Sequence, residues 1–531
     1  MMKKTPYASP IALLMCAATC TALGQVQQAG PVEPEVISTV GEFIPGIPEV
    51  PAAFLQDSAD LAWLTIDRRD LEEVPSENIL PQVPVDGVPF VVGINQKVSD
   101  PLTVENSGTW SVQPDGSWVW RLVVRQPEAV AIRVHLAQCD LPDEAEFVVG
   151  DPGGITVKRM TAFNAGPDGS LWTPPIPGDT MYIEYHCDEH PDGSPFRLVE
   201  AAHLWDESLG GSPYGPRGFG GCAVTPCQLD VMCFPPNAIA RDSVGRMLFS
   251  VGPNQSFCTG TLINDSNPAN TIPYFLTANH CISTQASASS LTVVWGYYSA
   301  LCGGTPPNPA TLPSTTGATL LANNSSQSSA GGTDMCFLQL ATTPSSGAAL
   351  AGWTTASPLA TDVLTGIHHP AGCRKRISTF TLDPTPYLCT DRDSTHFYNL
   401  DPVTGDVQGG SSGSALFNPS WQVVGQLLGR CGESLGCGST TRNMNYGRLD
   451  VAYPLIEPFM GPRYGTWGRP NTSQVAPDGT PARPFNVLTA QLALTPAGGR
   501  AWLYPSSSPT PVLINQSITI RSYGGVATIG R

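Results

Sequence analysis

The stretch Gly409–Leu416 reads Gly-Gly-Ser-Ser-Gly-Ser-Ala-Leu, and the apolar run 422–429 follows it. A serine between glycines suits nucleophilic catalysis, because a sharp turn must expose one hydroxyl and let backbone N–H groups approach the same reacting atom. Glycine–serine loops are common, so this stretch alone is a weak signal. A second stretch far upstream, 277–281 (Thr-Ala-Asn-His-Cys), strengthens it.

The histidine of that second stretch, His280, follows an apolar run over 273–278 that predicts a strand ending at the imidazole. Cys281 comes next, and Cys258 lies in another apolar run upstream. A bridge between these two cysteines would clamp neighbouring strands and fix the loop that carries His280. A buried histidine bonded to backbone is the alternative interpretation.

An aspartate, Asp334, begins the apolar run 335–340. A carboxylate at the start of a buried strand must be paired, because burying it alone is unfavourable. The Nδ1–H of a histidine is a natural partner, and a turn-capping aspartate is the alternative. The chain order His280, Asp334, Ser412 is that of the chymotrypsin-like proteases, whereas subtilisin and the α/β-hydrolases run differently.

From about Cys227 to Asp450 the sequence resembles the bacterial lysyl endopeptidases, a secreted branch of the trypsin-like serine proteases. The matching segments, in order, are 226–233, 256–263, 274–281, 293–295, 351–353, 366–370, 375–378, 410–414, 424–427 and 446–448. The resemblance implies an all-β fold, with a chymotrypsin-like double β-barrel as the catalytic unit. It also implies that the region before this unit is a propeptide.

The resemblance assigns a role to each residue of the constellation. Ser412 is the nucleophile, because the family motif places it third in Gly-Ser-Ser-Gly-Ser; Ser411 and Ser414 are the rival serines. His280 is the general base, Asp334 orients it, and the N–H groups of Gly410 and Ser412 form the oxyanion hole. No cofactor and no metal is expected.

The resemblance also implies structural roles for other residues. His368 and His369 correspond to a structural histidine pair. The implied disulfides are Cys233–Cys302, Cys373–Cys389, and Cys227 with Cys431 or Cys437.

The residues that would select the substrate depart from the family pattern. Met444 stands where the family has the aspartate on which lysine preference depends, and Leu428 stands where it has a histidine. A buried ammonium needs a countercharge, so we expect an apolar pocket and no lysine preference inherited from the family. Asp406, six residues before Ser412, is where trypsins carry the acid that reads Lys or Arg. A solvated loop aspartate is its alternative interpretation.

Composition limits the classes of partner. The 27 basic and 44 acidic residues give a net charge of −17, which argues against nucleic acid and anionic membranes. Only 13% of residues are charged, while Gly and Pro number 53 and 52, as in a loop-rich β protein. We expect a monomer that acts on protein or peptide substrates, with its own N-terminal domain as an intramolecular inhibitor.

The beginning of the chain resembles a secretory signal peptide over residues 1–24, with a basic start and an apolar stretch. A lipid anchor at Cys16 is the alternative. The signal predicts a secreted protein, extracellular or periplasmic, in which most cysteines should pair. Without Cys16 and Cys20 the number of cysteines is odd, so at least one thiol is expected to be free or the pairing incomplete.

The rest of the chain divides into three parts. Residues 25–221 form a β-rich propeptide domain and linker, whose alternating runs at 88–92, 118–124, 131–136 and 181–185 predict a β-sandwich. Its two cysteines, Cys139 and Cys187, are expected to pair. Residues 222–462 form the protease domain. Residues 463–531 form a tail or a small β-appendage, with a weak strand predicted over 486–494.

Three alternatives stay open on the sequence alone. The chain could be a catalytically inactive secreted binding protein on a trypsin-like fold. The cluster 186–190 (His-Cys-Asp-Glu-His) has metal-binding residue types and could mark a metalloprotein. The N-terminal domain could be a retained recognition module and not an inhibitor.

Overall fold

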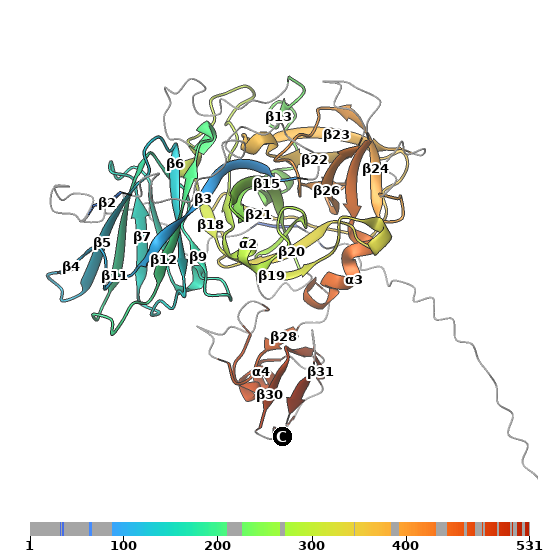
Figure 1. Cartoon of the computed structure of the whole chain (residues 1–531). Coiled ribbons are helices and arrows are strands. Elements are labelled where there is room, and N and C mark those ends of the chain that lie inside the picture. Colours follow the sequence, from blue (N-terminus) through green and yellow to red (C-terminus); the bar gives the residue numbers. More distant parts are fainter. Residues whose placement is uncertain are drawn as a thin grey trace, which may run out of the picture.

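The computed structural model describes residues 88–209, 226–265, 271–344, 346–383, 392–431 and 443–460. Shorter described pieces lie near residues 32–36 and 63–65, and between 465 and 529. The predicted signal peptide and residues 210–221 of the predicted linker lie outside the described residues, as do most of residues 25–75. Figure 1 shows the described chain as one N-terminal β unit, two barrels and a small C-terminal unit.

The N-terminal unit is a sandwich of two β-sheets, as the alternating runs predicted. One sheet contains β4 (Thr109–Val112), β5 (Trp118–Arg125), β7 (Glu146–Gly150), β8 (Val157–Met160) and β11 (Thr180–Cys187). The other contains β3 (Phe90–Leu102), β6 (Ala131–Ala137), β9 (Leu171–Trp172), β10 (Ile176–Pro177) and β12 (Arg197–Leu204). The buried rings of Trp120, Phe147, Tyr185 and Phe196 fill the space between them.

The first barrel closes because the continuous stretch 314–323 pairs with one strand through its first half and with another strand through its second half. Its strands are β14 (Val244–Val251), β15 (Asn254–Ile263), β16 (Tyr274–Ala278), β17 (Thr292–Val294), β18 (Ser314–Thr316), β19 (Ala318–Asn323) and β20 (Met335–Leu340). Gly317, at φ +84°, separates β18 from β19. Strand β18 pairs with β17 and β19 pairs with β20, which completes the ring.

The second barrel also closes on itself. It contains β22 (Leu364–His368), β23 (Arg376–Leu382), β24 (Phe397–Thr404), β25 (Ala415–Phe417), β26 (Val423–Cys431) and β27 (Asn443–Arg448). The strands follow the order β23-β22-β25-β26-β27-β24, and the pairing of β24 with β23 closes the ring. Helix α3 (Leu449–Met460) follows. Its buried side chains pack in a core cluster to which strands of both barrels contribute.

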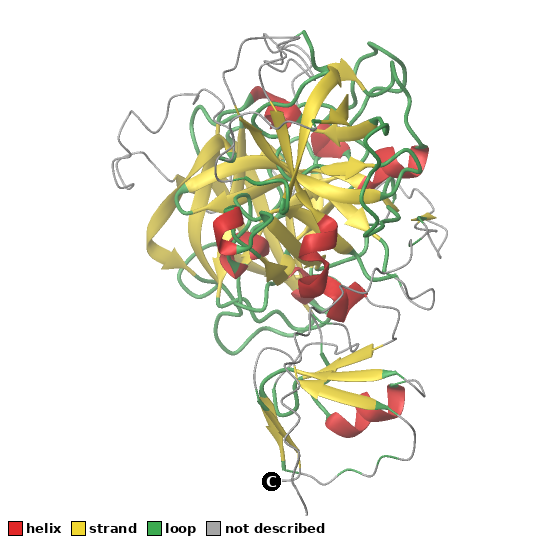
Figure 2. Ribbon diagram, turned by 90° about the vertical axis from the view of Figure 1, so that its right-hand side faces the viewer, coloured by secondary structure: helices red, strands yellow, loops and turns green. Residues whose placement is uncertain are grey.

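The C-terminal unit contains a helix where the sequence predicted a strand. Its parallel strands are β28 (Gly465–Gly468), β29 (Arg500–Leu503) and β31 (Thr519–Ser522), with β30 (Ser506–Ser508) paired to β32 (Ala527–Ile529). The predicted strand over 486–494 is wrong. This segment forms α4 (Leu488–Leu494), which lies beside the strands of this unit (Figure 2). The helical period suits it because Leu488, Gln491 and Leu492 share one buried face.

The cysteines of the described chain confirm part of the expected pairing. Cys233 bonds to Cys302 and Cys258 to Cys281. Cys227, Cys373 and Cys431 are also in disulfides, and their partners lie outside the described residues.

The expected Cys139–Cys187 bridge is wrong, since both thiols are free. The thiol of Cys187, at the end of β11, is directed to the carbonyl of Trp118 at 3.9 Å. Burial raises the pKa of the Cys139 thiol to about 12, so it stays protonated. Being the only two cysteines of a domain does not bring them into bonding geometry.

The sandwich and the first barrel share a continuous sheet. Strand β3 lies between β12 of its own domain and β15 of the barrel, as Figure 1 shows. Beside this seam, Arg133 of β6 is fully buried. Its guanidinium donates to Thr173 O at 3.0 Å, to Gln255 Oε1 at 3.1 Å and to Ser290 O at 2.7 Å. Burial lowers the pKa of Arg133 to about 9.

Within the described chain, no helix has both the length and the apolar character needed to cross a bilayer.

The buried hydrogen bonds of Arg133 provide a test of the contact between the sandwich and the first barrel. Arg133→Ala should lower the free energy of unfolding by about 3 kcal/mol, because it removes buried hydrogen bonds and leaves Gln255 and two carbonyls without their donor. The control Arg159→Ala breaks an exposed ion pair with Glu146 and should change it by less than about 1 kcal/mol. Urea titration of the full chain measures both, and equal effects would contradict the contact's role.

Candidate active site

Ser412 lies on the tight turn between β24 and β25, and two glycines make this turn possible. Gly410 has φ +90° and Gly413 has φ +83°. A Cβ on Gly410 would lie 2.8 Å from Ala371 N, and one on Gly413 would lie 2.2 Å from Thr277 Oγ1. Neither position can hold a larger residue without displacing its neighbours, so the glycines fix the backbone on both sides of Ser412.

The backbone of this turn leaves two N–H groups available. Three other N–H groups of the turn are occupied. The N–H of Ser411 donates to Gln408 O at 2.9 Å, that of Gly413 to Leu427 O at 2.8 Å, and that of Ser414 to Ser411 O at 3.1 Å. Among the described residues, the N–H groups of Gly410 and Ser412 have no acceptor. These are the two donors that the sequence assigned to an oxyanion hole.

His280 and Asp334 meet because their strands are neighbours. Strands β16 and β20 pair antiparallel with Ala278 opposite Met335, so the end of one lies beside the start of the other. Asp334 Oδ2 lies 2.6 Å from His280 Nδ1, and Oδ1 accepts the backbone N–H of His280 at 3.0 Å. Asp334 is fully buried and adopts φ +59°, a conformation that Asp tolerates better than most residues.

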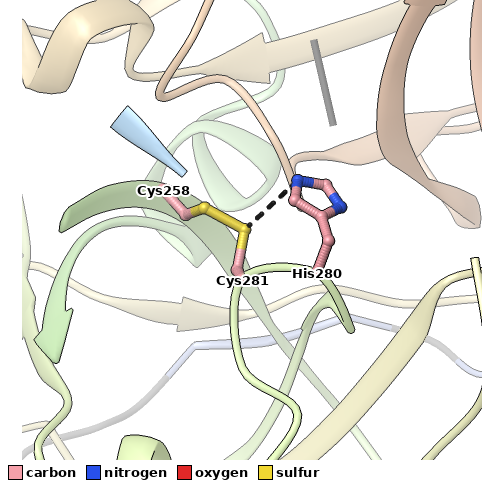
Figure 3. Close-up of side chains that lie close together, drawn as sticks. All are labelled: Cys258, His280 and Cys281. Carbon is pink, nitrogen blue, oxygen red and sulfur yellow. Dashed lines mark hydrogen bonds between the residues drawn. A yellow bond between two sulfur atoms is a disulfide. The ribbon is translucent and has the colours of Figure 1, made fainter. Parts of the chain in front are cut away.

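In the described structure, Ser412 and His280 form no hydrogen bond with each other, and each side chain has another neighbour. Ser412 Oγ donates to Leu428 O at 3.5 Å. His280 Nε2 lies 3.7 Å from Cys281 Sγ, and Figure 3 shows the ring against the Cys258–Cys281 bridge. Catalytic hydrogen bonds are often long before substrate binds, so this geometry is compatible with a general base that engages Ser412 later.

Thr259 of β15 bonds the first barrel to the turn that carries Ser412. Its N–H donates to Ser412 O at 2.8 Å, and its hydroxyl donates to Gly410 O at 2.8 Å. The same hydroxyl accepts the N–H of His369 at 3.0 Å. The sequence analysis did not single out Thr259, although it lies directly after Cys258.

A buried histidine, His368, supports the same turn from the second barrel. Its Nδ1 lies 2.8 Å from Ser411 Oγ and its Nε2 lies 3.0 Å from Ser378 Oγ. Ser378 in turn donates to Asp406 O at 2.9 Å. His369 is buried beside Tyr297, with Nδ1 2.7 Å from Cys373 O. The ring of His368 thus bonds to the turn itself through Ser411, whereas the ring of His369 bonds to Cys373.

The residues expected to select substrate lie in the second barrel. Met444 is fully buried, and its backbone lies opposite Leu400 on one side and Arg430 on the other. Leu428 is buried too, and its carbonyl accepts from Ser412 Oγ. Met444 thus belongs to the apolar core of the second barrel, and Leu428 meets the turn of Ser412 through its carbonyl.

Asp406 is buried, which corrects the interpretation of a solvated loop residue. It is only 3% exposed, and its Oδ1 accepts the N–H of Val407 at 2.8 Å. Its Oδ2 lies 3.7 Å from Arg430 Nη1, an arginine whose side chain is 9% exposed. Arg430, on strand β26 opposite Met444, is therefore a positively charged neighbour of the Asp406 carboxylate. It lies 24 residues away in the chain, and the sequence analysis did not identify it.

The metal-like cluster 186–190 is engaged in other contacts. His186 Nε2 lies 2.7 Å from Glu184 Oε2, and the His190 ring lies 4.6 and 4.9 Å from the rings of Trp110 and Trp118. In the part of the chain that the structure describes, the one close group of three metal-ligating types is Cys258, His280 and Cys281. The disulfide uses both of its sulfurs, so this group is not a metal site.

Two closed barrels, each of six strands when β18 and β19 are counted as one strand interrupted at Gly317, define the class, that of the trypsin-like proteases. Sequence comparison gives the family. The family model described as the lysyl endopeptidase C-terminal domain matches residues 223–447, and the lysyl endopeptidase N-terminal domain matches residues 64–198. A lysyl endopeptidase of Pseudomonas aeruginosa is 29% identical over 403 residues, covering 72% of this chain and 84% of the relative. The chain belongs to the lysyl endopeptidase family of trypsin-like proteases.

Solved structures with similarity to this chain include two proteases. An inactivated protease paralogue of the scabies mite covers 42% of this chain and 96% of its own, with 11% identity and a TM-score of 0.31. An HtrA-type protease with a tripeptide covers 46% of this chain and 69% of its own, with 16% identity and a TM-score of 0.29.

The buried His368 predicts a specific acid sensitivity. Burial lowers the pKa of His368 from 6.5 to about 3, so the unfolded chain binds more protons between these values and stability falls as pH falls through this window. His368→Gln removes this titration while keeping hydrogen-bonding groups. The loss of unfolding free energy between pH 7 and pH 5 should shrink by about 2 kcal/mol in the variant.

Urea titrations at pH 7 and pH 5 measure this difference. An identical loss in the wild-type chain and in His368→Gln would show that His368 is not held neutral in the folded protein.

Proposed function

We propose that this protein is a secreted serine endopeptidase that uses His280, Asp334 and Ser412 through an acyl-enzyme. The observation that carries the proposal is the 2.6 Å contact of Asp334 with His280 Nδ1, across the barrel junction from a serine held between two obligatory glycines. Neither feature alone is specific, but together they support a base, its orienting acid and a nucleophile on adjoining elements.

The reaction follows from these positions. Ser412 Oγ attacks the peptide carbonyl while His280 Nε2 takes its proton, and the carbonyl oxygen becomes an oxyanion. The N–H groups of Gly410 and Ser412 stabilise this oxyanion by about 2.7–4 kcal/mol for each donor. His280 returns the proton to the leaving amine, and water then releases the acyl group by the same steps. Asp334 accepts from Nδ1–H and stabilises the imidazolium.

The N-terminal domain acts in this proposal as a propeptide. The disulfides of the catalytic unit and the signal-like beginning of the chain support export to an oxidising compartment. The sandwich contacts the first barrel through β3 and Arg133, and the predicted linker joins it to the catalytic unit. Cleavage in the linker would release the mature enzyme from a zymogen.

The substrate pocket in this proposal prefers an apolar side chain before the scissile bond. Met444 and Leu428 supply no charge, and the carboxylate of Asp406 is buried beside Arg430. A lysine ammonium entering such a pocket would lose its hydration without gaining an unpaired countercharge.

The catalytic assignment is tested by non-additivity. Ser412→Ala and His280→Ala should each lower kcat by about 10⁴–10⁶, and the double variant should lose no more than the more severe single one, because the two groups act as a unit. Ser414→Ala, at the rival serine, should retain at least a tenth of the activity. Peptide hydrolysis by the activated enzyme measures all four. Full activity of Ser412→Ala would remove Ser412 as the nucleophile.

The pocket assignment is tested with matched peptides that differ only before the scissile bond. The enzyme should cleave after Leu or Met with at least tenfold higher kcat/KM than after Lys, about 1.4 kcal/mol. Arg430→Ala should lower the ratio of kcat/KM after Leu or Met to kcat/KM after Lys, because it removes the arginine beside the Asp406 carboxylate. The hypothesis is wrong if the wild-type enzyme cuts only after Lys or Arg and Asp406→Ala abolishes that preference.

A further inference from the structure

One edge of the catalytic unit carries an extended strand from the N-terminal domain. Strand β3 pairs antiparallel with β15, placing Ile94 opposite Asn254, Gly93 opposite Gln255, and Phe90 opposite Phe257. The opposite edge of β15 belongs to β14. The N-terminal domain therefore contacts the barrel by adding a strand to an available edge, a common mode of peptide recognition.

Side-chain contacts show that β3 is fitted to this edge. Asn95 Nδ2 donates to Ser250 Oγ at 2.5 Å and to Gly252 O at 3.1 Å. Asn95 Oδ1 accepts from Gln255 Nε2 at 2.6 Å. The backbone N–H of Asn95 donates to Pro253 O at 2.7 Å. Four hydrogen bonds from one residue make Asn95 the main polar anchor of β3 on the barrel.

An apolar cluster lies at the other end of the paired segment. Val92 of β3 and Leu204 of β12 pack with Leu248 and Phe257 of the barrel, and Phe90 lies against them. Leu248 and Phe257 are 2% and 0% exposed. Release of the N-terminal domain would therefore uncover an apolar surface beside Phe257.

The paired edge leads directly to the nucleophile. Two residues after Phe257, about 7 Å along a strand, Thr259 bonds to Ser412 O and Gly410 O. Between them, Cys258 is bonded to Cys281 beside His280 (Figure 3). The Gly372 backbone contacts Phe257 so closely that a Cβ there would lie 2.2 Å from its ring. Phe257 thus touches the loop that also supports the turn of Ser412.

The chain direction of β3 decides which segment of a substrate it resembles. Because β3 runs antiparallel to β15, its N-terminal end at Phe90 is the end nearest Ser412, and the chain then leads away from the site. In a substrate cleaved at Ser412, the segment after the scissile bond also has its N-terminal end beside the serine and leads away from it. Cleavage releases a new N-terminus at that end. The strand therefore has the polarity of a leaving product.

We propose that β3 occupies the Asn254–Phe257 edge of β15 as a product-like strand, and that it blocks there the substrate segment after the scissile bond until the N-terminal domain leaves. The proposal rests on the proposed function of Ser412. The partner is an extended peptide with a large apolar side chain at the position opposite Phe257, where Phe90 now lies. A folded or very short substrate lacks the backbone to pair with the edge.

The test compares two substrates on the intact chain and on the chain cleaved in its linker and freed of the N-terminal domain. A short peptide anilide with an apolar residue before the scissile bond has no segment to pair with β15. A quenched peptide that extends six residues beyond the bond does. Intact mass, checked before and after each assay, identifies the form that is active.

In the intact chain, kcat/KM for the extended peptide should be suppressed at least tenfold more than for the anilide, relative to the cleaved enzyme. Asn95→Ala should reduce this difference about tenfold, because it removes the polar anchor of β3. The matched control Asn106→Ala, whose side chain bonds only within the N-terminal domain, should leave the difference unchanged.

Equal suppression of both substrates, or no effect of Asn95→Ala on the intact chain, would overturn the proposal. Failure of the proposed function is a separate result, since the cleaved enzyme would then hydrolyse neither substrate. Hydrogen exchange provides a second readout that needs no activity. In the Ser412→Ala full chain, amides of 254–257 should be protected, and Asn95→Ala should raise their exchange at least tenfold.

Discussion

Thr259 holds the two barrels together at the point where chemistry is proposed. Its backbone N–H and hydroxyl bond to the carbonyls of Ser412 and Gly410. The N–H groups of the same two residues, Gly410 and Ser412, have no acceptor in the described structure. The same strand carries Cys258, which fixes the loop of His280 from the other side. A single strand, β15, thus contacts both the turn of Ser412 and the loop of His280.

Closure of the barrels explains the rest of the site. Pairing of β16 with β20 brings His280 and Asp334 to the same end of the first barrel, where two hydrogen bonds join them. The second barrel presents Ser412 from the turn before β25, supported by His368. Asp334, which has a positive φ, lies where the backbone turns from β19 into β20 within the first barrel.

The sequence predicted the features that depend on local pattern and spacing. Alternating runs gave the strands of the sandwich, and the Cys258–Cys281 bridge follows from two cysteines on apolar runs next to the histidine. Features that depend on distant partners were missed or wrong. Arg430 beside Asp406, the pairing of β3 with β15, and the free thiols of Cys139 and Cys187 depend on where separate strands meet. The 488–494 helix was mistaken for a strand because short apolar runs fit both periods.

The central claim is that Ser412, and no neighbouring serine, becomes acylated. The most direct measurement is covalent labelling of the activated enzyme with a peptidyl phosphonate that carries leucine before the reactive phosphorus, followed by tandem mass spectrometry. The account predicts one stoichiometric adduct on Ser412, formed more slowly in His280→Ala. An adduct on Ser411 or Ser414, or no adduct on the folded and linker-cleaved enzyme, would contradict it.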